Sequence, residues 1–455
     1  MSNSAKMSAR ERIETLVESN SFVEIGSMVT KRNTDFNMRE KAVPADGVIT
    51  GYGVIEDNLV YVYSQDAAAM NGSVGEMHAR KIASLYEMAV KAGAPVIGLI
   101  DCAGIRVEEA LDALAGFGEI YMAKLKAAGV VPQISAILGS CGGGVAISSK
   151  FSDITLMEAG EGRLFVNSPN ALDKNRIEAC DTSRAAFQAG AGNVDIVCEG
   201  EAEVLEQIRS LIQILPANAG MPAEKMTEDD PNRMLDGFSG DIKEALVQIA
   251  DDNNFIELKA EYGKEMVTGL MTLDGTTVGA IANANEGVLS TDGCKKAEQF
   301  MYFCDSFGIP VITLTNAKEY AATLEEEKTI SQAVADMTYA FASADVPRIN
   351  VITGEAYGSA YVAMNSKHIG ADLCLALDCA KVGVMDAQIA AKIMCEDEIA
   401  GAKDKKAAVA EKAKEYEKMQ DGAVAAAKRG YVDNIIEGAE VRKHLIYALQ
   451  MFGVR

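Results

Sequence analysis

Short apolar runs alternate with amphipathic stretches along the chain, and the same order of elements occurs twice. Each time, a hairpin-like pair of short apolar runs precedes a long stretch with helical spacing, at residues 78–92 and again at 294–307. A short aliphatic strand follows, at 96–100 and 311–314, and a further helical stretch leads to a second one, at 133–138 and 348–353. Strands that alternate with helices in this way predict an α/β fold.

The two runs of elements share one sequence pattern. GAPVIGLID at 93–101 aligns with GIPVITLTN at 308–316, and VPQISAILGSCGGG at 131–144 aligns with VPRINVITGEAYGS at 346–359, both at an offset of 215 residues. TGYGVIEDNLVYV at 50–62 aligns with TGLMTLDGTTVGA at 268–280 at an offset of 218, which indicates a short insertion between the matched blocks. Prolines and glycines that match at fixed positions predict an internal duplication.

The duplication sets the expected domain boundaries. The predicted domains are residues 1–225 and 232–455. The stretch between the two copies is rich in Pro, Gly, Asn and acidic residues, which is typical of a linker.

Composition narrows the classes of function. The chain has 455 residues, of which 49% are hydrophobic, so two or three domains with sizeable cores are expected. Its net charge is -23 and it has no basic run, which argues against a nucleic-acid partner. The nine cysteines form no CxxC pair, and no metal site is predicted. The N-terminus lacks the apolar core of a signal peptide, and no apolar run could span a membrane, so we expect a soluble cytoplasmic enzyme.

In each half, the second aliphatic strand leads into a glycine-rich segment that precedes a helix. These segments are GSCGGG at 139–144 and GEAYGS at 354–359, and we predict a turn at each. A glycine turn that opens a helix presents free backbone N–H groups and lets a ligand approach closely. Two such donors form an oxyanion hole, in which each donor is worth roughly 3–4 kcal/mol of barrier. The alternative is that the glycines only permit tight packing, and neither segment fits a dinucleotide-binding motif or a P-loop.

The first segment also fits a nucleophile elbow. GSCGG at 139–143 reads as G-x-C-x-G with Cys141 as the nucleophile. That interpretation needs a nearby base, and local sequence places none of the three histidines there. A small buried cysteine beneath the turn is the favoured interpretation, and a thioester hydrolase that uses Cys141 remains an alternative.

Several blocks, taken in order, resemble a known family. The chain is similar over nearly its whole length to the β (carboxyltransferase) subunits of biotin-dependent acyl-CoA carboxylases, such as propionyl-CoA carboxylase. It also resembles the α subunits of methylmalonyl-CoA and glutaconyl-CoA decarboxylases. The blocks that carry the resemblance include SARERIETLVESNSFVEIG (8–26), VYSQDAAAMNGSVGEMHARKI (62–82), GAPVIGLIDCAGIRVEEALDALAGFGEIY (93–121), AEQFMYFCDSFGIPVITL (297–314) and AYGSAYVAMNSKHIGAD (356–372).

The resemblance implies an architecture and a set of site residues. It implies two tandem crotonase-like (ClpP/crotonase) domains, of which the N-terminal half binds the acyl-CoA and the C-terminal half binds biotin. The backbone N–H groups of Gly142 and Gly143 would then hold the thioester enolate oxygen. Those of Gly358 and Ser359 would hold the ureido oxygen of biotin. The further binding residues that it implies are Gly72, Ser73, Gly104, Tyr357 and Ala360.

The implied reaction is carboxyl transfer between carboxybiotin and the coenzyme A thioester of a short-chain acid. The family places its active site between the N half of one subunit and the C half of another, commonly in a homo-oligomer that is a hexamer built as a trimer of dimers. This chain has no biotin attachment motif and no ATP-binding motif. Biotin is therefore expected on a separate carrier protein, with a biotin carboxylase or a membrane decarboxylase subunit as a further partner.

The biotin half departs from the family pattern. Where the family carries D-x-P-G-F-x-P-G, this chain reads TNAKEY at 315–320, without proline or glycine. The family's R-K-A-Y-G-G-A-Y-D reads GEAYGSAYV at 354–362, so Val362 replaces an aspartate that influences the choice of acyl chain. Two further alternatives therefore stay open: the decarboxylase subunit of a sodium-pumping complex, and a non-catalytic assembly subunit in a mixed complex with a paralogue.

Overall fold

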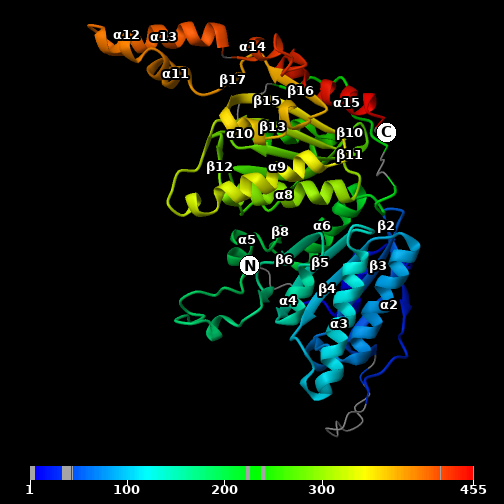
Figure 1. The fold of residues 1–455 in the computed structure, drawn as a ribbon. Helices are drawn as coiled ribbons and strands as arrows, with labels where there is room; N and C mark the ends of the chain where they lie inside the picture. Colours follow the sequence, from blue (N-terminus) through cyan, green and yellow to red (C-terminus); the bar gives the residue numbers. More distant parts are fainter. Residues whose placement is uncertain are drawn as a thin grey trace. The chain divides into compact units, whose positions relative to one another are not determined.

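The computed structural model divides the chain into two compact units, Met1–Ala223 and Glu224–Arg455. It describes residues 6–32, 43, 45–221, 226–236, 241–420 and 422–453. The predicted domain limits at 1, 225 and 455 lie outside the described residues. Each unit contains one large sheet with helices packed against it (Figure 1).

The two sheets have the same strand order. The N-terminal sheet runs β1-β2-β3-β4-β5-β6-β8, with β7 against the end of β5; the C-terminal sheet runs β9-β10-β11-β13-β15-β16-β18, with β17 against the end of β15. The N-terminal strands are β1 (Val23–Ile25), β2 (Val48–Ile55), β3 (Asn58–Gln65), β4 (Val96–Cys102), β5 (Gln133–Gly142), β6 (Ile154–Glu158), β7 (Arg163–Phe165) and β8 (Ile196–Cys198). The C-terminal strands are β9 (Phe255–Leu258), β10 (Met266–Leu273), β11 (Thr276–Asn283), β13 (Val311–Ala317), β15 (Arg348–Tyr357), β16 (Leu373–Leu377), β17 (Lys381–Gly383) and β18 (Asn434–Ile436). The first three strands of each path are antiparallel and the others are parallel, which confirms the predicted hairpins and α/β class.

The structure also locates the difference between the two sequence offsets. The hairpins β2–β3 and β10–β11 begin and end 218 residues apart, whereas β4 and β13, and β5 and β15, are 215 apart. The offset is already 215 at the next pairing, where Val74 bridges Ile105 and Leu289 pairs with Tyr320. The N half therefore has three additional residues in the loop 66–73.

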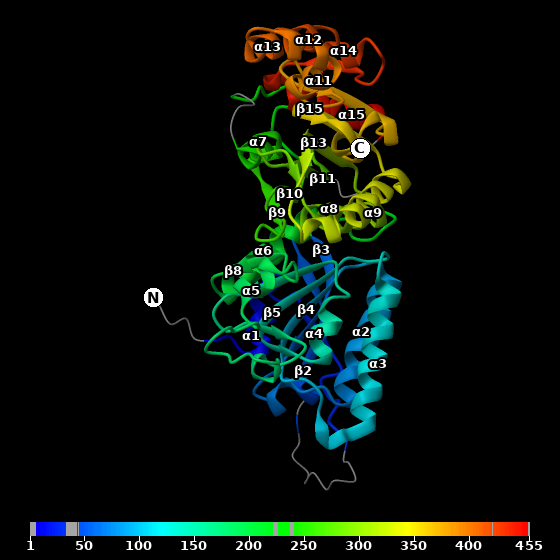
Figure 2. The ribbon, with the colours of Figure 1, turned by 60° about the vertical axis from the view of Figure 1, so that its left-hand side comes forward.

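Paired helices cover one face of each sheet. Helices α2 (Glu76–Ala92) and α3 (Ala110–Ala127) lie side by side in the N unit, as do α8 (Thr291–Ser306) and α9 (Ile330–Ser343) in the C unit (Figures 1 and 2). The apolar positions of α2 recur every three or four residues, so Ile82, Tyr86 and Ala89 share one buried face. Gly93 ends this helix in the left-handed conformation, with φ +66°.

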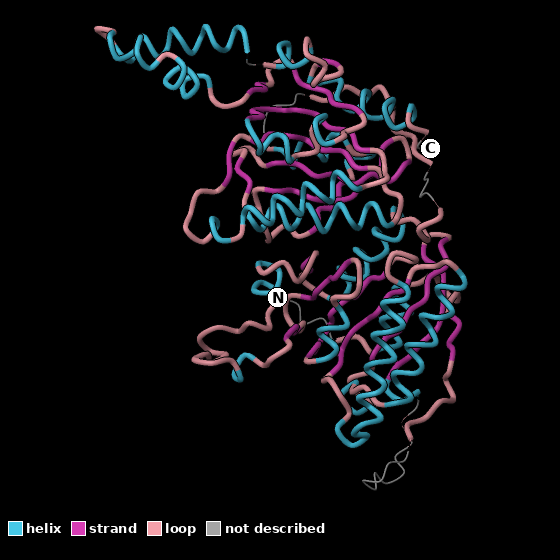
Figure 3. Tube along the Cα trace, viewed as in Figure 1, coloured by secondary structure: helices cyan, strands magenta, loops and turns pink. Residues whose placement is uncertain are grey.

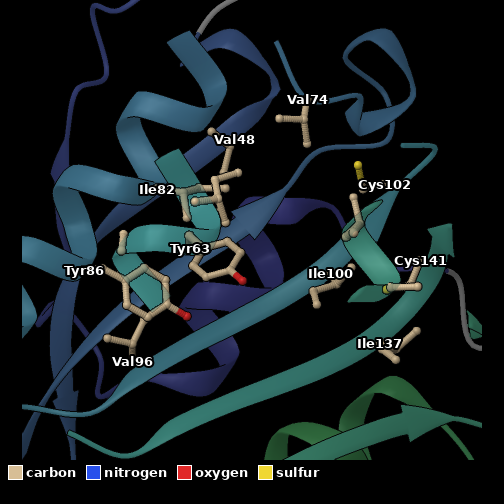
Figure 4. Close-up of a cluster of buried hydrophobic side chains, with 14 of the residues drawn as sticks. Val48, Tyr63, Val74, Ile82, Tyr86, Val96, Ile100, Cys102, Ile137 and Cys141 are labelled. Carbon is tan, nitrogen blue, oxygen red and sulfur yellow. The ribbon is translucent and has the colours of Figure 1, made fainter. Parts of the chain in front are cut away.

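The N-terminal core forms where this helix face meets the sheet. Val48, Tyr63 and Val96 come from three neighbouring strands and pack with Ile82 and Tyr86 of α2 (Figure 4). The Tyr63 and Tyr86 rings lie 6.3 Å apart, centroid to centroid. Apolar burial of this kind contributes about 25 cal/mol per Å² of buried surface. The packed face therefore fixes the position of α2 against the sheet.

The glycine-rich segments differ from the predicted turns. β5 continues to Gly142 and β15 to Tyr357, so most of each segment is strand. The register of each strand shifts against its neighbour, after Ile100 in β4 and after Thr315 in β13. Beyond the shift the ends of β5 and β15 still pair with β4 and β13, and they also pair with β7 and β17. The chain leaves the strand only at Gly143 and Gly358.

The glycines at 139 and 354 permit this shift. A Cβ atom at Gly139 would lie 2.1 Å from Oδ1 of Asp101, and one at Gly354 would lie 2.6 Å from Oδ1 of Asn316. Asp101 and Asn316 occupy matched positions at the ends of β4 and β13. For these two glycines the close-packing interpretation therefore holds. The candidate hydrogen-bond donors are the residues that follow them in each segment.

Four helices lie between β17 and β18 of the C unit along the chain. They are α11 (Ala387–Met394), α12 (Glu396–Gly401), α13 (Lys405–Gln420) and α14 (Ala423–Ala427) (Figure 3). Helix α13 packs on α11 through a small cluster of Ala387, Ala391, Ala413 and the half-buried Tyr416. None of the helices in the described part of the chain is long and apolar enough to cross a membrane.

His78 makes the stability of the N unit depend on pH. It is fully buried, its Nε2 lies 3.1 Å from Nε2 of Gln65, and its Nδ1 lies 3.0 Å from the carbonyl oxygen of Asp46. Burial, and then the nearby Arg106 cation, lower the pKa of His78 to about 3. Between pH 6.5 and 3 the unfolded chain therefore binds a proton that the folded chain does not.

We expect the free energy of unfolding to fall by roughly 1.4 kcal/mol per pH unit from this residue as the pH drops below about 6.5. Urea unfolding at pH 7, 6 and 5, followed by circular dichroism, measures the effect as the difference between the unaltered chain and His78→Gln. His444→Gln, in which the substituted side chain is partly exposed, serves as the control. Equal pH slopes for the unaltered chain and His78→Gln would contradict the prediction.

Candidate functional site

The N-terminal turn is built around one glycine. Gly143 has φ +60° and ψ −123°, and helix α4 (Gly144–Ser149) begins directly after it. A side chain in this conformation is strained, although a Cβ atom there would meet nothing within 4 Å. The N–H of Gly143 donates to the carbonyl of Phe165 over 2.9 Å. The N–H of Gly144 begins the helix, where no acceptor exists within the helix itself.

Gly72, Ser73 and Gly104 lie on two loops that are joined next to this turn. The N–H of Val74 donates to the carbonyl of Gly104 over 2.9 Å, and the N–H of Ala103 donates to the carbonyl of Asn71 over 3.0 Å. A Cβ at Gly104 would lie 3.7 Å from the carbonyl oxygen of Gly142. The structure therefore brings together the five N-terminal residues that the sequence singled out, and the three additional residues of the N half fall in the loop that carries Gly72 and Ser73.

A buried ion cluster holds these loops. Arg106 lies 2.5 Å from Asp46 and 2.8 Å from Glu109, and all three side chains are at least 99% buried. The guanidinium also donates to the carbonyl of Ser73 over 2.8 Å. Glu109 in turn accepts from the N–H of Glu76, at the start of α2, over 2.6 Å. One arginine therefore links the Ser73 loop, the Gly104 loop and the first turn of α2.

The C-terminal candidates are consecutive along the chain. Tyr357 ends β15, Gly358 follows with φ +57°, and Ser359 and Ala360 lie in the first turn of helix α10 (Gly358–Ala363). All four residues line a pocket of about 530 Å³. This volume lies in the range of about 300–1,000 Å³ that is usual for small-molecule sites. A second pocket of about 390 Å³ also borders Gly358 and is lined by Tyr361, Val362 and His368 among others.

The structure adds two residues that the sequence did not single out. At the offset of 215, Gly143 corresponds to Gly358 and Gly144 to Ser359, so the repeat itself could have drawn attention to Gly144. Tyr320 donates its hydroxyl hydrogen to Oγ of Ser359 over 3.0 Å and lines the same pocket. Tyr320 belongs to the segment that lacks the family's prolines and glycines, and no local signal indicated that it contacts Ser359.

Cys141 does not have the surroundings of a nucleophile. Its side chain is fully buried on β5 beside Cys102 of β4 (Figure 4), and burial raises the pKa of the Cys141 thiol to about 12. A thiol in that state is inert at neutral pH. Six of the nine cysteines are buried, Cys395 is half-buried, and Cys180 and Cys379 are exposed. Within the described ranges, no three or more His, Cys, Asp and Glu side chains form a group that could hold a metal ion.

Comparisons with known proteins show the family of the chain. The family model of the carboxyl transferase domain matches residues 2–453. The propionyl-CoA carboxylase beta chain of Roseobacter denitrificans is 36% identical over 97% of this chain and 90% of its own length. The methylmalonyl-CoA decarboxylase subunit alpha of Propionigenium modestum is 35% identical over 98% and 90%, respectively.

A solved structure gives the same result for the fold. The crystal structure of transcarboxylase 12S, a hexamer with hydrolysed methylmalonyl-coenzyme A bound, superposes with a TM-score of 0.93 at 33% identity. The superposition covers 99% of this chain and 90% of that one. It confirms the predicted fold class, two tandem crotonase-like α/β domains.

Proposed function

This chain belongs to the carboxyl transferase family of biotin-dependent acyl-CoA enzymes, and from that premise we propose that it moves a carboxyl group between carboxybiotin and a short-chain acyl-CoA. The observation that carries the proposal is that the same glycine turn occurs twice, at Gly143 and at Gly358. The first turn lies beside the Ser73 and Gly104 loops, and the second lies beside the pocket of about 530 Å³. We assign the acyl-CoA to the N-terminal half and biotin to the C-terminal half.

The N-terminal turn is assigned to the thioester. Gly142 and Gly143 are the proposed donors to the enolate oxygen, and the repeat adds Gly144. Because the N–H of Gly143 is donated to Phe165, its use on a ligand requires that bond to be released, whereas the N–H of Gly144 has no such acceptor within its helix. We assign Gly72, Ser73 and Gly104, on the two joined loops beside the turn, to binding of the thioester; of the three, Gly104 lies next to the turn, with its Cβ position 3.7 Å from the carbonyl oxygen of Gly142.

The C-terminal turn is assigned to biotin. When bound, carboxybiotin would supply the carboxyl group that the acyl-CoA receives, and its ureido group would supply the base for the α-proton. The proposed task of the N–H groups of Gly358 and Ser359 is to stabilise negative charge on the ureido oxygen. A pocket of about 530 Å³ with Tyr357 and Ala360 beside these donors has the size and polarity for a bicyclic urea. Two oxyanion holes and the juxtaposition of two reactants supply most of the catalysis that such a reaction needs.

The direction of transfer has two candidates. The carboxylase relatives and the decarboxylase relatives are equally similar to this chain, at 36% and 35% identity. We therefore propose the transfer without a fixed direction: synthesis of the carboxylated acyl-CoA is one candidate, and the reverse reaction, in the decarboxylase subunit of a sodium-pumping complex, is the other. The proposed partners are a biotin carrier protein with a biotin carboxylase, or with a membrane subunit, around a cytoplasmic homohexamer or a mixed assembly with a paralogue.

Decarboxylation with free biotin tests the proposal. We expect the purified full chain to remove the carboxyl group of malonyl-CoA, methylmalonyl-CoA or glutaconyl-CoA only when biotin is present, as measured by acyl-CoA chromatography. Val362 stands where the family has an aspartate that influences the choice of acyl chain. The comparison of the three substrates therefore also shows which acyl group this chain prefers. Loss of the carboxyl group at the same rate without biotin would contradict the proposal. A folded chain without any turnover would support the non-catalytic assembly role.

A further inference from the structure

We propose that the side-chain hydroxyl of Ser359, oriented by Tyr320, is a third hydrogen-bond donor to the oxygen that the C-terminal turn binds. This inference rests on the proposed function of that turn. Ser359 stands where the family pattern has a glycine. Tyr320 belongs to the segment that replaces the proline-rich and glycine-rich segment of the family. The inference assigns Ser359 a direct contact with the ligand, and Tyr320 the role of a positioning residue.

The direction of the hydrogen bond carries the argument. A hydroxyl group has one hydrogen to donate and two lone pairs to accept with. Tyr320 donates to Oγ of Ser359 over 3.0 Å, so this bond uses a lone pair of Ser359 and leaves its hydrogen available. Tyr320 and Ser359 both line the pocket of about 530 Å³, together with Gly358. The remaining hydrogen of Ser359 is therefore available to a ligand in that pocket.

The backbone of Tyr320 is held firmly enough to orient a partner. Strand β14 (Glu319–Tyr320) pairs in parallel with β12 (Val288–Leu289), and the N–H of Ala321 donates to the carbonyl of Leu289 over 2.8 Å. On the preceding side, the N–H of Lys318 donates to the carbonyl of Gly287 over 2.9 Å. The tyrosine thus projects from a short sheet that is fixed on both sides of it.

Asn316 ties the base of this segment to the strand that carries the turn. Its side chain accepts from the N–H of Glu355 over 2.9 Å and donates to the carbonyl of Asn285 over 3.0 Å. The segment that replaces the family's proline and glycine loop is therefore an ordered support for Tyr320. Burial raises the pKa of the Tyr320 phenol, which keeps it a donor throughout the neutral range.

The N half provides an internal comparison. At the offset of 215, Tyr320 corresponds to Ile105 and Ser359 to Gly144, and the backbone pairing of Ile105 with Val74 repeats that of Tyr320 with Leu289. This backbone pairing occurs in both halves, but only the C half carries two hydroxyl groups at these positions. A purely structural need of the fold would apply to both halves, so the pair is a feature of what the C-terminal turn binds.

Side-chain variants of the full chain test the inference, because they leave the backbone N–H groups intact. In biotin-dependent decarboxylation, Ser359→Ala is expected to lower kcat about 10²-fold, which is the usual effect of losing one oxyanion donor. Tyr320→Phe is expected to lower it about 10-fold, and the double variant to match Ser359→Ala within about 2-fold, because Tyr320 acts through Ser359. KM for the acyl-CoA should stay unchanged in all three.

Tyr339→Phe removes an exposed hydroxyl from α9 and is the matched control, with the activity of the unaltered chain expected. Unaltered kcat in Ser359→Ala, or independent losses that multiply in the double variant, would overturn the inference while leaving the proposed function intact. Absence of biotin-dependent turnover in the unaltered chain would instead overturn the proposed function, and the inference with it.

Discussion

Replacing Arg106 with methionine is expected to lower the free energy of unfolding of the N unit by about 3–5 kcal/mol. The substitution leaves the carboxylates of Asp46 and Glu109 buried without their cation, and both side chains are at least 99% buried. Burial already raises the pKa of Asp46, with the Arg106 charge opposing that rise, so removing the cation favours a protonated Asp46. Urea denaturation followed by circular dichroism measures the loss.

Arg80→Met on α2 is the matched control for this prediction. Arg80 forms an ion pair with Glu76 over 2.9 Å, but its side chain is 53% exposed, so a change below about 1 kcal/mol is expected. A triple variant, Asp46→Asn, Arg106→Met and Glu109→Gln, removes every charge of the cluster and should recover part of the stability. If Arg106→Met were no more harmful than Arg80→Met, the buried cluster would not be what holds the site loops.

The second large effect is expected for Gly143→Ala, which should lower kcat for biotin-dependent decarboxylation by about 10²–10³-fold. The φ of +60° and ψ of −123° at Gly143 are unfavourable for alanine, by roughly 1–3 kcal/mol. The ψ angle of this residue sets the direction of the Gly144 N–H, so relaxation of the strain turns that donor away from the ligand. Steady-state kinetics measure the effect.

Gly118→Ala on α3 is the control, because a Cβ atom at Gly118, as at Gly143, would meet nothing within 4 Å. Its backbone is helical, so the substitution is expected to leave kcat unchanged and to stabilise the chain by about 0.4–1 kcal/mol. Circular dichroism separates a local effect of Gly143→Ala from unfolding. Full activity in a folded Gly143→Ala variant would remove the turn from the proposed mechanism.

Much of the fold could be predicted from the sequence because its signals are local. Aliphatic runs at 96–100 and 133–138 became β4 and β5, and the offset between repeated prolines and glycines predicted two halves with the same order of elements, which the two sheets have. The predicted ends of β5 and β15 were wrong, because a run of glycines predicts a turn. In the structure these glycines make room for the Asp101 and Asn316 side chains and let the strand continue.

The site was harder to predict because its contacts join distant parts of the chain. Arg106 contacts Asp46, which is 60 residues away in the sequence, and Tyr320 contacts Ser359, which is 39 residues away. Sequence motifs do not indicate contacts between residues so far apart. The positions of Gly142, Gly143, Gly358 and Ser359 were indicated by local pattern and by the family resemblance, and their roles stay predictions. Gly144 could have been found by applying the offset of 215 to Ser359.

The distribution of thiols gives the chain a practical property. Cys180 in the N unit and Cys379 in the C unit are exposed, six others are buried, and only Cys395 has intermediate exposure. A maleimide dye should therefore attach at one point on each unit, and Cys395→Ser removes the competing thiol without touching either site. Energy transfer between a donor and an acceptor dye on this nearly native chain then tests whether the separation of the two halves changes when an acyl-CoA or biotin binds.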